Sequence, residues 1–228
     1  MTAEVKDQMP RPIDTTAWSE DKLRAVLAET GEGYQRLAAT LDTDESPEAV
    51  YGRIVFAMLT VNSPIDASLA AYKQVMLAGA QAPNLAEIIG TQWRGVGSPV
   101  MYANQKAKYI REFDERWGRN PYLFTCAYDD DDMWRTRLAH SIRGLGIAKA
   151  SFAVALVKPS EADVCCIDTH MFQILQGSGF YRKESEYRRL ESKVRQLAGE
   201  FGLSTFAAQW CLWDAKRGEV NEHRELRS

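Results

Sequence analysis

Apolar residues recur along this chain at spacings of three and four residues, which is the period of one face of an α-helix. The clearest run lies between residues 48 and 61, where the apolar positions are Val50, Ile54, Val55, Met58 and Leu59. Weaker runs predict further helices over about residues 19–30, 34–41, 65–78, 84–92, 99–117, 133–142, 184–200 and 204–216. Because the two-residue alternation typical of strands is scarce, the pattern predicts an all-α fold.

Capping residues place several of the helix boundaries. Ser46 followed by Pro47 indicates a helix start, since serine caps free amide groups and proline suits the first helical position. The sequence Asn62-Ser-Pro64 ends that helix. The acidic run Asp129–Asp132 is interpreted as the N-terminal cap and dipole partner of the helix near residue 133.

The predicted helices group into two lobes, one of which combines both ends of the chain. We expect a loose tail over residues 1–17 and a terminal lobe built from residues 18–63 and 158–228. A central helical lobe over residues 64–157 ends in a helix hairpin. With 228 residues, 45% of them hydrophobic, the chain is long enough to bury a substantial core.

The sequence shows no membrane-spanning segment and no secretory signal peptide. Its first residues, MTAEVKDQMPRPID, lack an apolar run, and no stretch of 18 apolar residues occurs anywhere. The four cysteines show no disulfide spacing and no C-x-x-C pair, which favours buried free thiols; they are Cys126, Cys165, Cys166 and Cys211. These features predict a soluble, cytoplasmic protein without membrane contact.

Charge is spread unevenly, although the net charge is only −3. Residues 1–50 carry 5 Lys or Arg against 11 Asp or Glu, so the remainder of the chain is net positive. Between Met133 and Ser160 no acidic residue occurs, and the basic residues are Arg135, Arg137, Arg143, Lys149 and Lys158. A local basic face can bind phosphate because screening limits the reach of distant charges.

A glycine turn lies between two predicted helices in the sequence Ile142-Arg-Gly-Leu-Gly-Ile-Ala-Lys-Ala. Glycines at positions 144 and 146 allow a positive φ and a close approach of the backbone to a ligand. The amides that follow lie at a helix N-terminus, which favours an anionic phosphate, and Leu145 would pin the turn to the core. Taken alone, the same turn also fits an ordinary connection between two helices.

Downstream, Asp168 stands between an apolar segment and a further predicted helix, in the sequence Val164-Cys-Cys-Ile-Asp-Thr-His170. An isolated aspartate in this place is explained by capping of the helix. The glycine turn followed about 20 residues later by Ile-Asp-Thr-His at a helix start resembles the helix-hairpin-helix (HhH-GPD) DNA glycosylase superfamily. Endonuclease III and the oxoguanine glycosylases have closely similar Val-Asp-x-His segments.

The resemblance extends upstream and covers roughly residues 50–215. Phe56-Ala-Met-Leu-Thr-Val-Asn62 is similar to the family segment whose final Gln or Asn fills the hole left by a flipped-out base. Gly95–Lys108 resembles the family's Gly-x-x-x-x-Lys-Ala helix entry. The resemblance implies two helical lobes with double-stranded DNA bound across the cleft and the target base extruded from the helix.

The resemblance also implies roles for individual residues in DNA binding. Asn62 would stabilise the gap, and His170 would lie near a phosphate, although a partly buried helix histidine fits equally well. The hairpin would hold a phosphate through Arg143, Gly144, Leu145 and Gly146, with a K⁺ or Na⁺ ion on the carbonyl groups near the two glycines. No side-chain metal site is visible, since His140, His170 and His223 are scattered.

Asp168 would be the catalytic carboxylate. Breaking an N-glycosidic bond builds positive charge on the sugar, and a fixed carboxylate both stabilises that charge and activates water. Two departures from the family limit the analogy. Where family members that also cut the strand carry a lysine, this chain has Ala148, and Lys149 follows one place later, where we expect it to contact phosphate.

The second departure is that only Cys211 lies where endonuclease III-like proteins carry four cysteines, too few for an iron–sulfur cluster. The sequence therefore predicts a monomeric, monofunctional glycosylase that needs no cofactor and acts at the nucleoid or inside an infected host cell. One alternative is a phage-type base-hypermodifying enzyme of the same fold, similar to glutamyl/putrescinyl thymine pyrophosphorylases or amino acid:DNA transferases. Another is a DNA-binding module without catalysis. The sequence does not name the base.

Overall fold

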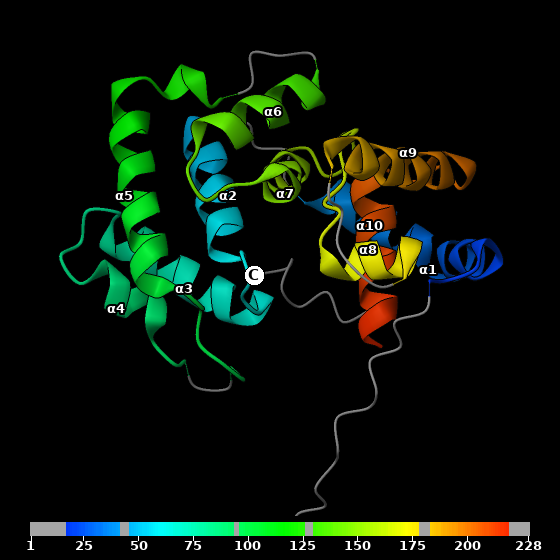
Figure 1. Cartoon of the computed structure of the whole chain (residues 1–228), viewed down its shortest axis with the longest axis horizontal. Coiled ribbons are helices and arrows are strands. Elements are labelled where there is room, and N and C mark those ends of the chain that lie inside the picture. Colours follow the sequence, from blue (N-terminus) through cyan, green and yellow to red (C-terminus); the bar gives the residue numbers. More distant parts are fainter. Residues whose placement is uncertain (1–16, 42–45, 94–95, 126–129, 178–182, 219–228) are drawn as a thin grey trace, which may run out of the picture.

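The computed structural model of the chain describes residues 17–41, 46–93, 96–125, 130–177 and 183–218. Over these residues the protein is all-helical, with ten α-helices, one short 3₁₀ turn and no strand (Figure 1). The predicted tail up to residue 16, Cys126 and His223 lie outside the described residues.

The helices are α1 (Glu20–Thr40), α2 (Pro47–Leu59), α3 (Ile65–Ala78), α4 (Leu85–Gly90), α5 (Ala103–Arg119), α6 (Asp131–Ser141), α7 (Ile147–Val157), α8 (Thr169–Gln176), α9 (Glu184–Glu200) and α10 (Thr205–Arg217). The 3₁₀ turn η1 (Pro121–Leu123) follows α5. Every predicted helix is present, and the predicted capping residues act as expected. The Ser46 hydroxyl accepts from the amide of Ala49, and the Asp130 carboxylate accepts from the amides of Asp132 and Met133.

One boundary prediction is wrong. The segments predicted as separate helices over residues 19–30 and 34–41 form a single helix, α1, which runs through Gly31. A Cβ atom at Gly31 would lie 2.6 Å from the side chain of Leu203, so this glycine serves close packing against the chain that leads into α10. Glycine inside a helix interior is unfavourable by itself, but here the tertiary contact outweighs that propensity.

Two groups of helices flank the buried α7 (Figure 1). On one side α1 packs against α10, which also contacts α8 and α9; on the other, α3, α4 and α5 pack against one another in sequence order. The contacts of α2 are with α3, α5 and α7, so α2 lies with the central helices, whereas the sequence analysis grouped it with the terminal lobe. The second half of α2, Ile54–Leu59, is buried on every side, so its periodicity could not show which lobe it joins.

The hydrophobic core is continuous from the terminal helices through α7 into the central helices. Within the described residues, no helix combines the length and apolarity needed to cross a membrane.

Candidate active site

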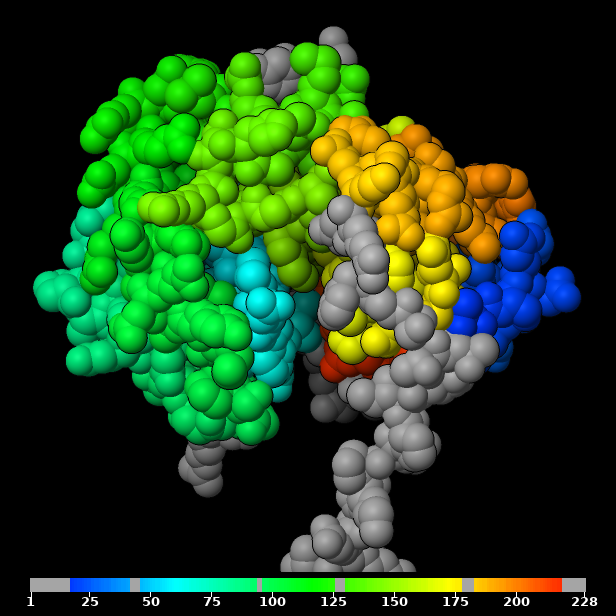
Figure 2. Space-filling view, viewed as in Figure 1, coloured from blue at the N-terminus to red at the C-terminus, as the bar shows by residue number. Residues whose placement is uncertain are grey.

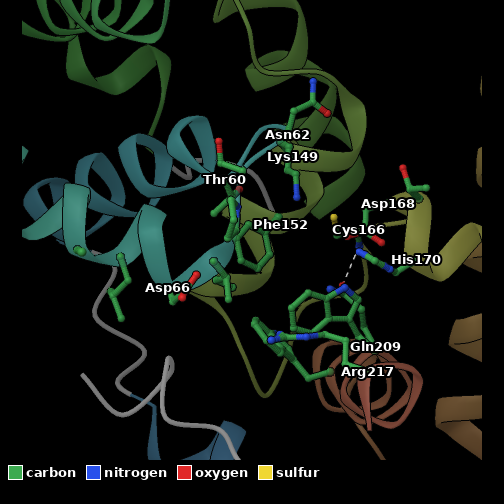
Figure 3. A pocket seen from close by; sticks show the side chains of 18 of the residues that line it. Thr60, Asn62, Asp66, Lys149, Phe152, Cys166, Asp168, His170, Gln209 and Arg217 are labelled. Atoms are coloured by element: carbon green, nitrogen blue, oxygen red, sulfur yellow. Dashed lines mark hydrogen bonds between the residues drawn. The ribbon is translucent and has the colours of Figure 1, made fainter. Parts of the chain in front are cut away.

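A cavity of about 1030 Å³ opens between the two groups of helices. Figure 2 shows the surface hollowed between α2 and the yellow α8, and Figure 3 shows the side chains that line the cavity. Four predicted site residues line it, namely Asn62, Lys149, Asp168 and His170. These residues come from the turn after α2, the start of α8 and the start of α7, so the tertiary fold gathers positions more than 100 residues apart.

Asp168 caps helix α8. Its Oδ1 atom accepts a hydrogen bond of 3.0 Å from the amide of Met171, so the capping interpretation is confirmed. No donor among the described residues contacts its second oxygen, Oδ2, and the half-buried side chain borders the cavity. Capping therefore fixes the orientation of the carboxylate while one oxygen stays available to a ligand.

The extended segment before Asp168 is held by side chains instead of by a neighbouring strand. The amide of Cys165 donates to Glu191 Oε1 at 2.8 Å, and the amide of Cys166 donates to Gln209 Oε1 at 2.8 Å (dashed in Figure 3). The Tyr187 hydroxyl accepts from the amide of Ile167 at 3.3 Å and donates to the carbonyl of Cys165. Because buried backbone groups need partners, these side chains determine where the carboxylate lies.

The sequence analysis did not identify these supporting residues. Glu191 offers a signal, because it occupies an apolar-face position of α9, four residues after Tyr187 and three before Val194. Its carboxylate is also bound by Arg135, whose Nη1 lies 2.6 Å from Glu191 Oε1. Arg135 is fully buried in this ion pair, so its expected place on a basic DNA-facing surface is wrong.

The hairpin has the expected positive φ at Gly144 but not at Gly146, whose φ is −76°. Gly144 has a φ of +83°, and a Cβ atom there would lie 2.4 Å from the ring of Tyr109, so the position needs glycine for both reasons. Leu145 is buried in the core, as predicted. Arg143 is exposed beside the turn, with its Nη1 3.6 Å from Glu112 and its guanidinium over the Tyr109 ring.

Lys149 lines the cavity, and Ala148 packs against the hydrophobic core instead. The Lys149 amine lies 5.3 Å from the ring centre of Phe152, one turn further along α7, and points toward Cys166 in Figure 3. Burial raises the pKa of the Cys166 thiol to about 12, so this side chain lines the cavity as an uncharged thiol. The expected contact of Lys149 with a phosphate stays a prediction.

Aromatic side chains of α10 form the opposite wall. Trp210 and Trp213 pack edge to face at 5.2 Å, and their buried indole N–H groups have no acceptor among the described residues. His170 is exposed and stands edge-on to Trp213 at 6.0 Å, so the alternative of a buried helix histidine does not hold. The Gln209 amide oxygen accepts from the amide of Cys166, and Gln209 also lines the cavity.

The cavity lining carries both signs of charge. Lys73, Lys149 and Arg217 contribute positive charge, while Asp66 and Asp168 contribute carboxylates. Among the described residues, no group of three or more His, Cys, Asp or Glu side chains could hold a metal ion. A site with several cations and few carboxylates suits an anionic ligand that also needs one negative group at a defined point.

The chain is similar to a known protein family and to several solved structures. A family model described as 8-oxoguanine DNA glycosylase matches residues 19–203. A solved 8-oxoguanine glycosylase/lyase from Methanocaldococcus jannaschii, in complex with a 15mer DNA containing 8-oxoguanine, is 19% identical with a TM-score of 0.62, covering 90% of this chain and 94% of that one. The 8-oxoguanine DNA glycosylase of Thermotoga maritima is 21% identical with a TM-score of 0.62, covering 89% and 94%.

A second structure of the Methanocaldococcus jannaschii enzyme is 17% identical with a TM-score of 0.64, covering 88% of this chain and 94% of that one. At these identities the likeness of the solved structures shows a shared fold. A comparison with curated protein sequences finds no match.

Proposed function

This chain belongs to the 8-oxoguanine DNA glycosylase family, and we propose that it excises 8-oxoguanine from duplex DNA by cleaving the N-glycosidic bond. The observation that carries the proposal is the position of Asp168, a carboxylate with one unpaired oxygen at a cavity wide enough for a flipped-out nucleotide. The family match gives no support to the alternative of a base-hypermodifying enzyme.

Asp168 would act on the sugar of the extruded nucleotide. As the bond to the base breaks, C1′ gains positive charge, and Oδ2 stabilises that charge because it is fixed and half shielded from water. The same oxygen can accept a proton from the water that attacks C1′. The supporting bonds to Glu191 and Gln209 hold the segment in place, so little reorganisation is needed when the charge develops.

The cavity offers aromatic surface to a flipped-out base. Trp213 lines it from α10 and Phe152 from α7, so both rings can serve as stacking surfaces. The indole N–H groups of Trp210 and Trp213 are buried and therefore do not read the base. The choice of 8-oxoguanine as the target base is supported by the family match.

The hairpin and Asn62 would hold the DNA. Gly144 and Leu145 keep carbonyl oxygens to which no backbone amide of the described residues donates, whereas the Gly146 carbonyl accepts from Ala150. These free carbonyls fit the K⁺ or Na⁺ ion that the family resemblance implies, and such an ion would bind a DNA phosphate. Asn62, exposed at the cleft with a φ of +51°, would fill the gap left by the extruded base.

The first test is excision from defined duplexes. We expect the protein to make a duplex with a single 8-oxoguanine sensitive to hot alkali, because excision leaves an abasic site. Matched duplexes with guanine, uracil, an alkylated purine or an oxidised pyrimidine at that position should stay intact. Quantifying the free base by mass spectrometry checks that the glycosidic bond is the one broken. An 8-oxoguanine duplex that stays intact under all conditions would contradict the proposal.

Strand cleavage is a second candidate activity, favoured by the cavity position of Lys149. The sequence analysis expected hydrolysis alone, because Ala148 occupies the place of the family's lysine. In the lyase reaction the Lys149 amine would attack C1′ in place of water, and the base would leave. Opening of the C1′–O4′ bond would then give a Schiff base, and loss of a C2′ proton would allow the C3′–O bond to break with the phosphate as the leaving group.

Borohydride trapping separates the two activities, because it reduces a Schiff base to a stable covalent link. If Lys149 acts as the nucleophile, we expect a trapped protein–DNA complex with the native chain and none with Lys149→Gln. Lys73→Gln, which removes another cavity cation, serves as the control that should still be trapped. If the native chain is not trapped while alkali reveals excision, the protein acts by hydrolysis alone.

A further inference from the structure

Lys106 joins the Asn62 turn to helix α5. From the second turn of α5, its amine donates to the carbonyls of Leu59 and Val61 at 2.6 and 2.7 Å, and to the hydroxyl oxygen of Ser63 at 2.8 Å. Val61 and Ser63 lie immediately before and after Asn62, so one amine binds the chain on both sides of this residue.

Ser63 adds a second link between the turn and the start of α5. Its Oγ accepts from the amide of Met101 at 2.9 Å as well as from Lys106. Asn62 itself has a φ of +51°, a conformation that non-glycine residues adopt rarely and only where the surroundings hold them. The bonds from Lys106 and Met101 supply that restraint. None of them involves the Asn62 side chain.

The setting of Lys106 is unusual for a lysine. Lys106 is 5% exposed, and its amine is bound by two carbonyls and a hydroxyl, with no ion pair to a carboxylate among the described residues. Burial, together with the nearby charge of Lys149, lowers the pKa of Lys106 to about 7. An apolar residue of similar length would fill the same space without desolvating a charge, so packing alone does not explain the amine.

The carbonyl acceptors compensate for the desolvation of the Lys106 ammonium. Leu59 is the last residue of α2, and carbonyl groups at a helix C-terminus lack partners and carry partial negative charge. The Lys106 ammonium therefore ends α2 and holds the chain that leaves it.

We propose that Lys106 is a positioning residue that holds the backbone of the Asn62 turn in the conformation in which Asn62 enters the DNA gap. The inference rests on the gap-filling role assigned to Asn62 under the proposed function. Lys106 acts only through Asn62, and it touches neither the base nor the sugar.

The test measures the affinity for a duplex that contains a tetrahydrofuran abasic-site analogue, relative to an intact duplex. It uses native protein, Lys106→Met, Asn62→Ala and the double variant. Methionine keeps the length of the side chain and removes its donors. We expect each single variant to weaken selectivity for the gapped duplex about tenfold, and Lys106→Met to change it less than about twofold in the Asn62→Ala background.

A spectroscopic readout accompanies the affinities. 2-Aminopurine opposite the gap should show a fluorescence change on binding of the native protein that Lys106→Met and Asn62→Ala both reduce. Lys193→Met is the matched control, because this lysine pairs with Glu20 on the terminal helices, away from the cavity lining. Thermal unfolding confirms that each variant is folded.

Additive effects of Lys106→Met and Asn62→Ala would overturn the proposal, since they would show a role independent of Asn62. Unchanged selectivity in Lys106→Met would overturn it as well. If Lys106→Met does not fold, Ser63→Ala replaces it, because this variant removes one acceptor and the link to Met101. The readouts need no excision, so a protein that leaves 8-oxoguanine in place can still pass this test, and the two proposals fail separately.

Discussion

Asparagine in place of Asp168 is expected to give a folded protein that binds damaged DNA but excises the base about 10²- to 10⁴-fold more slowly. Asparagine caps a helix about as well as aspartate, so the hydrogen bond from Oδ1 to the amide of Met171 is retained. The variant loses only the negative charge that we propose faces C1′. Affinity for DNA should stay equal or rise, because a carboxylate repels the phosphates.

Single-turnover excision of 8-oxoguanine, measured beside DNA affinity and thermal unfolding, checks this expectation. Asp66→Asn is the matched control, because Asp66 lines the same cavity from the start of α3 and its Oδ1 accepts from the amide of Ala67. Asp66→Asn removes one negative charge from the cavity and should retain most of the rate. A native rate in Asp168→Asn would rule out the assigned role, and equal losses in both variants would point to overall charge instead.

Alanine in place of Gly144 is expected to lower the unfolding free energy by about 2–4 kcal/mol and to weaken DNA binding. The left-handed φ of +83° is unfavourable for any residue with a Cβ, and that Cβ would lie 2.4 Å from the Tyr109 ring. Either the ring or the hairpin must move. Since Arg143 also rests on the Tyr109 ring, a shift would displace the groups proposed to hold the phosphate.

Variants at two other glycines separate the effect of the left-handed φ from the effect of the contact with Tyr109. Gly79 has a φ of +82° with nothing near its Cβ position, so Gly79→Ala should lower the unfolding free energy by only about 1–2 kcal/mol and leave DNA binding unchanged. Gly146 has a φ of −76° and open space, so Gly146→Ala should leave stability unchanged or raise it by up to about 1 kcal/mol.

Urea unfolding and fluorescence anisotropy with a labelled duplex measure the two properties for all three glycine variants. A loss of DNA affinity in Gly146→Ala at full stability would support a close approach of DNA to the hairpin backbone. A Gly144→Ala variant with native stability and native affinity would contradict both the packing argument and the assigned role of the hairpin.

Local interactions account for what the sequence determined by itself. Ser46, Asp130 and Asp168 each cap a helix through amides two or three residues further along the chain, so their roles are readable from neighbouring residues. The helix periodicity predicted an all-α fold for the same reason. The glycine turn and Asp168 could be recognised as a pair because both motifs are short and contiguous.

Long-range contacts decided the rest. Glu191 and Gln209 bind the amides of Cys165 and Cys166 across 26 and 43 residues of sequence, and no local pattern specifies such partners. The continuity of α1 depends on Leu203, and the place of α2 depends on which helices bury its several apolar faces.

The residues that line the cavity likewise combine features readable from the sequence with features set by tertiary packing. A helix beginning at Ile147 follows from the sequence, but its rotation against the core decides that Lys149 faces the cavity while Ala148 packs inward. Trp210 and Trp213 fit a core role from the sequence, and only the gap left between α10 and α3 makes them a wall of the cavity. Helices and caps arise from bonds between near neighbours, whereas a cavity arises from the packing of distant helices, so its lining is fixed only in the tertiary structure.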